Sequence, residues 1–249
     1  MNRNLYDGDI TIWSPQGRIY QVEYAMEAVK QGSTCVGARS STHAVLATVK
    51  RSPGALAGYQ KKIIEIDDHM GVAISGLTSD ARVLSRYMRN ECLNHKFVFD
   101  SPMVPGRLVR QVADKSQIHT QQGGRRPYGI GLLVIGYDHN GPHLYETCPS
   151  GNYFDYEAQA VGSRCQSAKT YLEKKFETFK SCSQDELVKH VLFALRESMG
   201  DKTELSEKNV SIAVVGENQK FKIIENEEVA PYIAALEGDE KEDVKMEES

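Results

Sequence analysis

The sequence lacks the features of a membrane protein or of a disulfide-rich secreted protein. Its apolar runs stay far short of the roughly 20 residues that a membrane-spanning helix needs, so we expect no membrane contact. The five cysteines are Cys35, Cys92, Cys148, Cys165 and Cys182. Because they are odd in number, widely spaced and without a CxxC pair, we predict free thiols packed as small apolar side chains, not disulfides or zinc ligands.

The motifs of common catalytic and cofactor sites are missing as well. The chain holds no GxSxG, no phosphate-binding GxxxxGKS or GxxxxGKT, and no HExxH. Its seven histidines lack metal-ligand spacing, so we expect no cofactor and no metal, and we predict histidines in loops and at the surface. The first twelve residues are polar, unlike a signal peptide, which leads us to expect a location in the cytoplasm and nucleus.

Negative charge is concentrated at the end of the chain. The formal net charge is −4, and residues 237–249 alone contain seven acidic residues and two lysines. The rest of the chain is therefore close to neutral, which gives no electrostatic basis for binding nucleic acid. We predict a single domain over residues 1–236, followed by an acidic disordered tail over 237–249.

The most strongly patterned stretch covers residues 14–32, a turn and a helix. Pro15 fixes φ, Gly17 permits a tight turn, and Ser14 is placed to cap the following helix. An apolar stripe with 3-4-3 spacing then predicts an amphipathic helix that ends before Gly32. The stripe consists of Ile19, Val22, Met26 and Val29.

The remaining pattern alternates short strands with pairs of helices. We predict strands at 33–38, 44–49, 61–66, 70–75, 130–137, 143–147, 153–156, 210–215 and 221–223. Two helices are expected between residues 78 and 120, two more at 165–179 and 184–199, and a short one near 227–236. The turn-like links between strands indicate antiparallel sheets, and the order as a whole indicates the α+β class.

Two local expectations accompany this assignment. The first helix after residue 78 should bury one stripe, made of Ala81, Leu84, Met88, Cys92 and Leu93. The loop over 121–127 should carry Arg125 and Arg126 as a solvated pair or, in an assembly, opposite an acidic neighbour.

The N-terminal residues resemble the signature of 20S proteasome alpha subunits. The matching residues are Tyr6-Asp7, Thr11, Ser14-Pro15-x-Gly17-Arg18-x-x-Gln21-Val22-Glu23-Tyr24-Ala25 and Gly32-Ser33-Thr34, and the resemblance continues to Ser211. It implies a four-layer αββα sandwich of the N-terminal-nucleophile hydrolase type, extended by an N-terminal helix. It also implies a non-catalytic structural and gating subunit that controls substrate entry in ATP- and ubiquitin-dependent protein degradation.

The same resemblance implies partners and two groups of site residues. The partners are other alpha subunits in a heteroheptameric ring, beta subunits, and a regulatory particle or other activators. Residues 1–13 would form a gate tail held by a cluster of Tyr6, Asp7, Pro15 and Tyr24. A pocket of Gly32, Lys62, Gly76 and Leu77 would accept the C-terminal carboxylate of an activator, for which a lysine and close backbone approach are physically suited. The alternative for a lone Lys62 is a solvated lysine at a strand edge.

No catalytic residue is expected. The resemblance places Ser33 where active beta subunits have their N-terminal threonine, but Ser33 follows thirty-two residues and has no free amine. The acidic residue that assists the threonine in active beta subunits would fall near Lys50, so the charge at this position is reversed. Lys62 alone makes no catalytic site. Two other function classes stay open from the sequence, a self-processed hydrolase cleaved before Ser33 and a stand-alone binding module.

Overall fold

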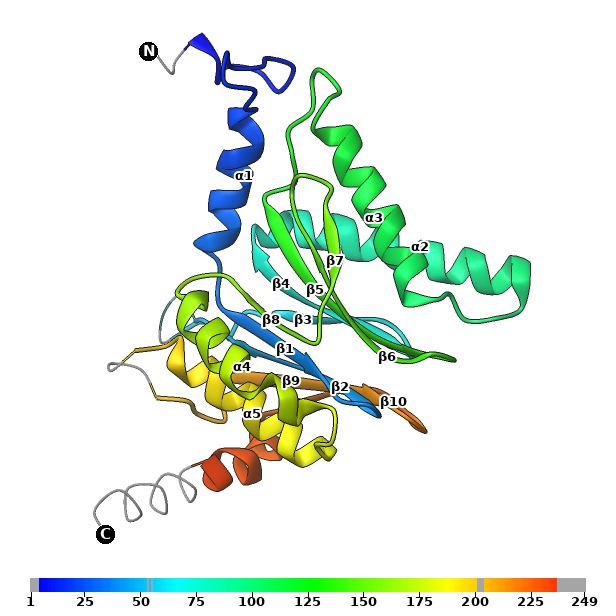
Figure 1. Ribbon diagram of the computed structural model, residues 1–249, viewed down its shortest axis with the longest axis vertical. Coiled ribbons are helices and arrows are strands. Elements are labelled where there is room, and N and C mark those ends of the chain that lie inside the picture. Colours follow the sequence, from blue (N-terminus) through cyan, green and yellow to red (C-terminus); the bar gives the residue numbers. More distant parts are fainter. Residues whose placement is uncertain (1–4, 53, 55, 201–203, 237–249) are drawn as a thin grey trace.

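The chain folds into two five-stranded antiparallel sheets packed face to face and covered by helices on both outer sides (Figure 1). The computed structural model describes residues 5–52, 54, 56–200 and 204–236, and the predicted acidic tail lies outside them. Sheet A has the strand order β10 (Gln219–Glu225), β9 (Val210–Gly216), β2 (His43–Val49), β1 (Cys35–Arg39) and β8 (Ala158–Val161). Sheet B has the order β3 (Ile63–Asp67), β4 (Met70–Gly76), β5 (Ile130–Asp138), β6 (Gly141–Thr147) and β7 (Tyr153–Asp155).

Two helices cover each outer face. Helices α4 (Cys165–Phe179) and α5 (Gln184–Glu197) pack on sheet A, whereas α2 (Thr78–Phe99) and α3 (Pro105–His119) pack on sheet B. The chain closes with the 3₁₀ helix η2 (Asn226–Val229), and residues 230–236 continue as helix. The αββα sandwich implied by the resemblance is therefore confirmed. None of the helices in the described part of the chain is both long and apolar enough to cross a bilayer.

Apolar residues that occupy both faces of the central strands produce the layers. In β2, Val45 and Ala47 point to the helices over sheet A, while Ala44 and Leu46 point to sheet B. Successive side chains of a strand face opposite sides, so a strand buried on both faces reads as a continuous apolar run. This explains why the sequence shows such runs in the antiparallel strands of this chain.

Local signals start and end several helices as the sequence predicts. Pro105 stands at the first position of α3, and Ser183 with Glu186 forms a capping box at the start of α5. In α2, the predicted stripe is buried except for Leu93, whose exposed fraction is 67%. The prediction was wrong for Leu93 because it follows the buried Cys92 by one residue, and the helix turn of about 100° per residue points it away from the core.

Helix α1 (Tyr20–Lys30) stands apart from the four layers. It projects from the end of the sandwich at which β1 begins, and it contacts β4 and β5 (Figure 1). Helix α1 can pack closely on β5 because Gly131 of β5 has no side chain, and Val29 of α1 lies directly over it. The N-terminal segment is thereby held away from the core, at one extreme of the molecule.

Candidate functional site: the N-terminal segment and the glycine junction

A closed turn connects the N-terminal segment to α1. The Ser14 amide donates to the Arg18 carbonyl at 2.9 Å, and the Arg18 amide donates to Ser14 Oγ at 3.1 Å. Gly17 has φ +72°, a left-handed value that favours glycine. The expectation that Ser14 caps the helix was wrong, because Ile19 is the N-cap and no side chain caps it. Ser14 stabilises the preceding turn instead.

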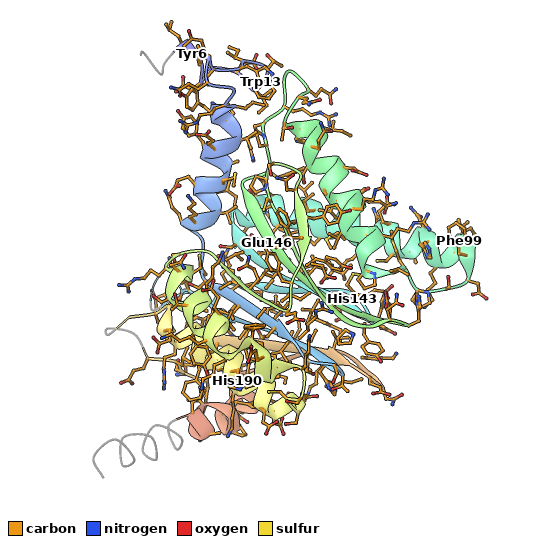
Figure 2. The ribbon with its side chains drawn as sticks, in the orientation of Figure 1. Tyr6, Trp13, Phe99, His143, Glu146 and His190 are labelled. Atoms are coloured by element: carbon orange, nitrogen blue, oxygen red, sulfur yellow. The ribbon has the colours of Figure 1, made fainter. Side chains whose placement is uncertain are left out.

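The structure brings two residues of the predicted gate cluster together. The Tyr24 hydroxyl donates to Asp7 Oδ2 at 3.0 Å, and the Gln21 side-chain amide donates to the Asp7 carbonyl. Tyr6 is half-buried beside this point, whereas Pro15 is exposed in the turn. Figure 2 shows Tyr6 and Trp13 beyond the free end of α1. Helix α1 therefore holds the N-terminal segment through side chains on its first turns.

Helix α1 is covered on one side only. Tyr20 and Ala25 are buried, but Met26 of the predicted apolar stripe is 39% exposed. Tyr24 is exposed to a similar degree, and Trp13 lies exposed before the turn. An apolar helix face left open in this way is typical of a contact surface between subunits.

Three glycines meet where α1 joins β1. A Cβ on Gly32 would lie 2.2 Å from the Gly76 amide nitrogen, and a Cβ on Gly76 would lie 2.2 Å from the Gly129 carbonyl oxygen. The Ser75 hydroxyl lies 2.9 Å from the Val29 carbonyl and 3.1 Å from the Ser33 carbonyl. Backbone approach this close is open to glycine alone. We call this group the glycine junction (Gly32, Ser75, Gly76 and Gly129).

Lys62 is buried near this junction. Its exposed fraction is 5%, and the Ile74 amide donates to its carbonyl at 3.0 Å. Burial lowers the pKa of the Lys62 ammonium, and Arg51 lowers it further. The alternative of a solvated lysine at a strand edge is therefore wrong. Leu77, the fourth predicted pocket residue, is 46% exposed at the start of α2, where its amide donates to Gly129.

The residues in the positions of a catalytic site lack the geometry of one. Ser33 is 4% exposed, and its backbone carbonyl accepts a hydrogen bond from the Ser75 hydroxyl at 3.1 Å. Lys50 is also buried, with Nζ 3.4 Å from Glu225 Oε1, so its charge is compensated on sheet A. The charged or ionisable neighbours that shift the pKa of Lys62 are Cys35 and Arg51, and neither is a carboxylate. The described residues thus supply no acid beside Ser33 and Lys62.

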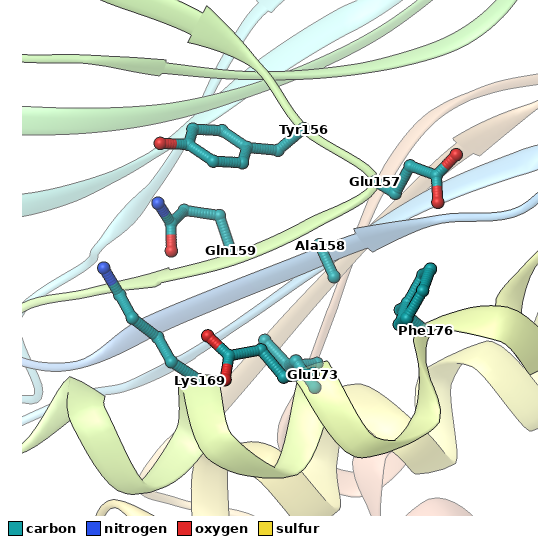
Figure 3. A pocket seen from close by; sticks show the side chains of 8 residues that line it. Tyr156, Glu157, Ala158, Gln159, Lys169, Glu173 and Phe176 are labelled. Atoms are coloured by element: carbon teal, nitrogen blue, oxygen red, sulfur yellow. The ribbon is translucent and has the colours of Figure 1, made fainter.

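A separate cavity of about 400 Å³ lies between β8 and α4 (Figure 3). Its lining includes Tyr156, Gln159, Lys169 and Glu173, with Leu172 and Phe176 as apolar parts. Gln159 Nε2 donates to Glu146 at 2.7 Å, which fixes the amide. No residue of either predicted site lines this cavity, and it contains no paired nucleophile and base.

Comparison with known proteins decides the family. Residues 29–215 match the family model for proteasome subunits, and residues 6–28 match the model for the N-terminal signature of A-type proteasome subunits. The chain belongs to the alpha-type subunits of the proteasome. The N-terminal match covers the turn, the Asp7 anchor and most of α1, which are the features that stand apart from the sandwich.

Curated relatives agree over nearly the full length. The chain is 58% identical over 241 residues to the alpha type-1 proteasome subunit of Dictyostelium discoideum, and the match covers 96% of this chain and 97% of that protein. It is 52% identical to the probable alpha type-6 proteasome subunit of Schizosaccharomyces pombe (95% and 87% covered) and 46% to alpha type-1 of Drosophila melanogaster (94% and 85%). Alpha subunits assemble with other proteasome subunits, which argues against a stand-alone binding module.

Sequence reasoning missed the ion pair that fixes the 121–127 loop in this member of the alpha family. Arg126 donates to both Asp80 oxygens, at 2.7 and 2.8 Å, and the Gly129 amide donates to Asp80 at 2.9 Å. Arg126 is therefore paired within its own chain although its side chain is 62% exposed, and the exposed Arg125 lies with Nη1 3.4 Å from His119 Nε2. The two partners lie forty-six positions apart, and no periodic signal in the sequence reveals their contact.

The prediction that the histidines lie in loops and at the surface was wrong for two of them, His143 and His190. His143 is half-buried in β6, with Nε2 3.0 Å from Asp138 Oδ1, and the Tyr171 hydroxyl lies 3.0 Å from His190 Nδ1 (Figure 2). Burial lowers the pKa of His190. Within the described part of the chain, no three His, Cys, Asp or Glu side chains are grouped as a metal ion would need.

We predict that Asp80→Asn lowers the free energy of unfolding by about 1.5–3 kcal/mol, the usual contribution of hydrogen bonds to a charged group. The Arg126 guanidinium lowers the pKa of Asp80, so the pair stabilises the chain above the unfolded pKa of about 3.9. This stabilisation is lost as the pH falls through the lower, folded value. Thermal unfolding from neutral to acid pH should show the variant and parent converging below about pH 4. A constant gap, or an equal loss in Asp9→Asn at an exposed position, would contradict the assignment.

Proposed function

We propose that this chain is a non-catalytic structural and gating subunit of the outer ring of the 20S proteasome core. In this role residues 1–13 control substrate entry, and the chain acts in ATP- and ubiquitin-dependent protein degradation in the cytoplasm and nucleus. The anchoring of Asp7 by Tyr24 and Gln21 is the observation that carries the proposal. These hydrogen bonds, together with the buried Ile10, hold a largely polar segment at one extreme of the molecule.

Two exposed apolar surfaces support assembly with other alpha subunits and with beta subunits. The first is the open side of α1 with Met26 and Tyr24. The second is the end of α2, where Leu93, Phe97, Val98 and Phe99 are each more than half exposed. Large apolar side chains gathered in this way are costly in water and are typical of surfaces that another subunit covers.

Docking of a regulatory particle or another activator is assigned to the glycine junction with Lys62 and Leu77. Because the backbones of Gly32 and Gly76 lie in close contact, backbone groups would line the proposed pocket, and Lys62 would supply the positive charge for a terminal carboxylate. Lys62 is already desolvated, so a carboxylate that reaches it would form a stronger ion pair than one at the open surface.

The non-catalytic part of the proposal has a direct test. We expect Ser33→Ala to leave every peptidase activity of the assembled particle unchanged, because Ser33 has no free amine and no neighbouring acid. Rates would be measured on purified particles in which mass spectrometry confirms the variant. Loss of one activity in an intact particle would instead support the self-processed hydrolase.

A further inference from the structure

A second concave site lies beside the glycine junction, on the outer side of sheet A. It is a cleft of about 490 Å³ at the edge where β1 begins and β2 and β8 end, within the size range of small-molecule sites. Lys50, Arg51 and Arg164 line it, together with several hydroxyl groups, including those of Ser52 and Ser163. No carboxylate among the described residues contributes to the lining, and none of the four docking residues does.

Among the described residues, no acidic side chain compensates the charge of the two arginines. Lys50 has Glu225 at 3.4 Å, but no described carboxylate lies within 4 Å of either guanidinium. Arg51 Nη2 lies 3.3 Å from Ser163 Oγ, and Arg164 Nη1 donates to the Met199 carbonyl at 3.1 Å. Both partners are neutral, so the cleft keeps two positive charges beside the buried Lys50.

Backbone constraints hold these groups in place. The Ser163 amide donates to the Gly32 carbonyl at 2.9 Å, and Thr34 Oγ1 donates to the Ser163 carbonyl at 2.5 Å. Arg164 has φ +56°, a left-handed value that is unfavourable for arginine. Its guanidinium packs over Gly200, where a Cβ would lie only 2.3 Å from Nη1. These contacts fix the Ser163 backbone and the Arg164 guanidinium at the edge of the cleft.

We propose that this cleft binds the phosphate groups of a phosphorylated small molecule. A phosphate carries a charge of about −1.5 to −2 near neutral pH, which matches the two uncompensated guanidiniums. Planar guanidinium groups bind phosphate oxygens through paired hydrogen bonds, and hydroxyl groups satisfy the oxygens that remain. A single carboxylate would balance only one of the two charges. The assignment is independent of the gating and docking roles.

Calorimetric titration of the full chain with inorganic pyrophosphate tests the site. We expect binding of one pyrophosphate per chain, weaker binding of inorganic phosphate, and still weaker binding of citrate as the carboxylate probe. Arg51→Gln and Arg164→Asn should each weaken pyrophosphate binding at least tenfold. Asparagine is chosen because it tolerates the left-handed backbone at position 164. Arg110→Gln, at an exposed position of α3, removes the same charge elsewhere and should have no effect.

Three results would overturn the proposal. They are no heat of binding with millimolar pyrophosphate, an equal loss of affinity in Arg110→Gln, and tighter binding of citrate than of pyrophosphate. Circular dichroism confirms the fold of each variant before titration. If Arg164→Asn fails to fold, Arg51→Gln decides alone, because Arg51 lies in the ordinary backbone region and is exposed.

Discussion

Deletion of residues 2–12 is expected to raise basal hydrolysis of small peptides by the assembled particle severalfold. Ordering a segment costs about 1–2 kcal/mol per residue, so this segment stays in place only through specific contacts. The structure supplies the Asp7 hydrogen bonds and one buried apolar side chain, Ile10, which is 3% exposed. In the proposed gating role, removing these contacts should open the entrance, while α1 begins later, at Tyr20, and is left intact.

Single substitutions separate anchoring from a general effect of the deletion. Asp7→Ala removes only the hydrogen bond from Tyr24, which is worth about 1 kcal/mol or roughly fivefold in the population of the ordered segment, so it should give a smaller increase than the deletion. Tyr6→Ala removes one half-buried side chain and should also give a smaller increase. Asp9→Ala is the matched control, because Asp9 is exposed and its carboxylate only accepts from Thr11 nearby. Unchanged hydrolysis in the deletion variant, with incorporation shown by mass, would mean that this segment takes no part in closure.

Lys62→Ala is expected to weaken binding of an activator whose C-terminal carboxylate enters the proposed pocket. Removing one partner of a desolvated charge pair costs about 2–5 kcal/mol per site, and the loss of affinity would be smaller for an activator that docks at several pockets. Because burial lowers the pKa of Lys62, docking should be lost on raising the pH earlier than it would be with an ordinary lysine. Affinity would be measured on intact particles across pH and salt.

Lys61→Ala provides the control for this experiment. Lys61 precedes Lys62 in the chain but is exposed, so its removal changes the net charge equally without touching the buried position. Affinity and pH dependence should match the parent particle. Equal weakening by both variants would indicate a diffuse electrostatic effect, and no weakening by Lys62→Ala would remove Lys62 from the docking site.

The apolar runs and helical periods of the sequence predict the α+β class and most of the strands and helices, whereas the four-layer sandwich is implied by the resemblance to proteasome alpha subunits. The sequence does not predict β8, since Ala158–Val161 is only four residues long and offers little contrast with the loop before it. Nor does it predict the sheet to which each strand belongs. Strand β8 follows β7 in the chain but pairs with β1 in the other sheet, through a contact more than one hundred residues away.

The candidate site is predicted in part. A patterned N-terminal run of residues locates the turn, α1 and Gly32, because such local geometry depends on residue type. Ser75 and Gly129 join the glycine junction only in the folded chain. The burial of Lys62 is different, since it depends on how β3 meets the end of sheet A, and a lysine at the start of a strand ordinarily faces water. The Asp80–Arg126 pair is likewise a product of the folded chain.

Native mass spectrometry of the particle purified through this chain tests the central claim most directly. We expect a full-length chain of 27.8 kDa, found in a large complex together with other alpha subunits and with beta subunits. A chain that begins at Ser33 in that complex, or a full-length chain found only as a monomer, would contradict it.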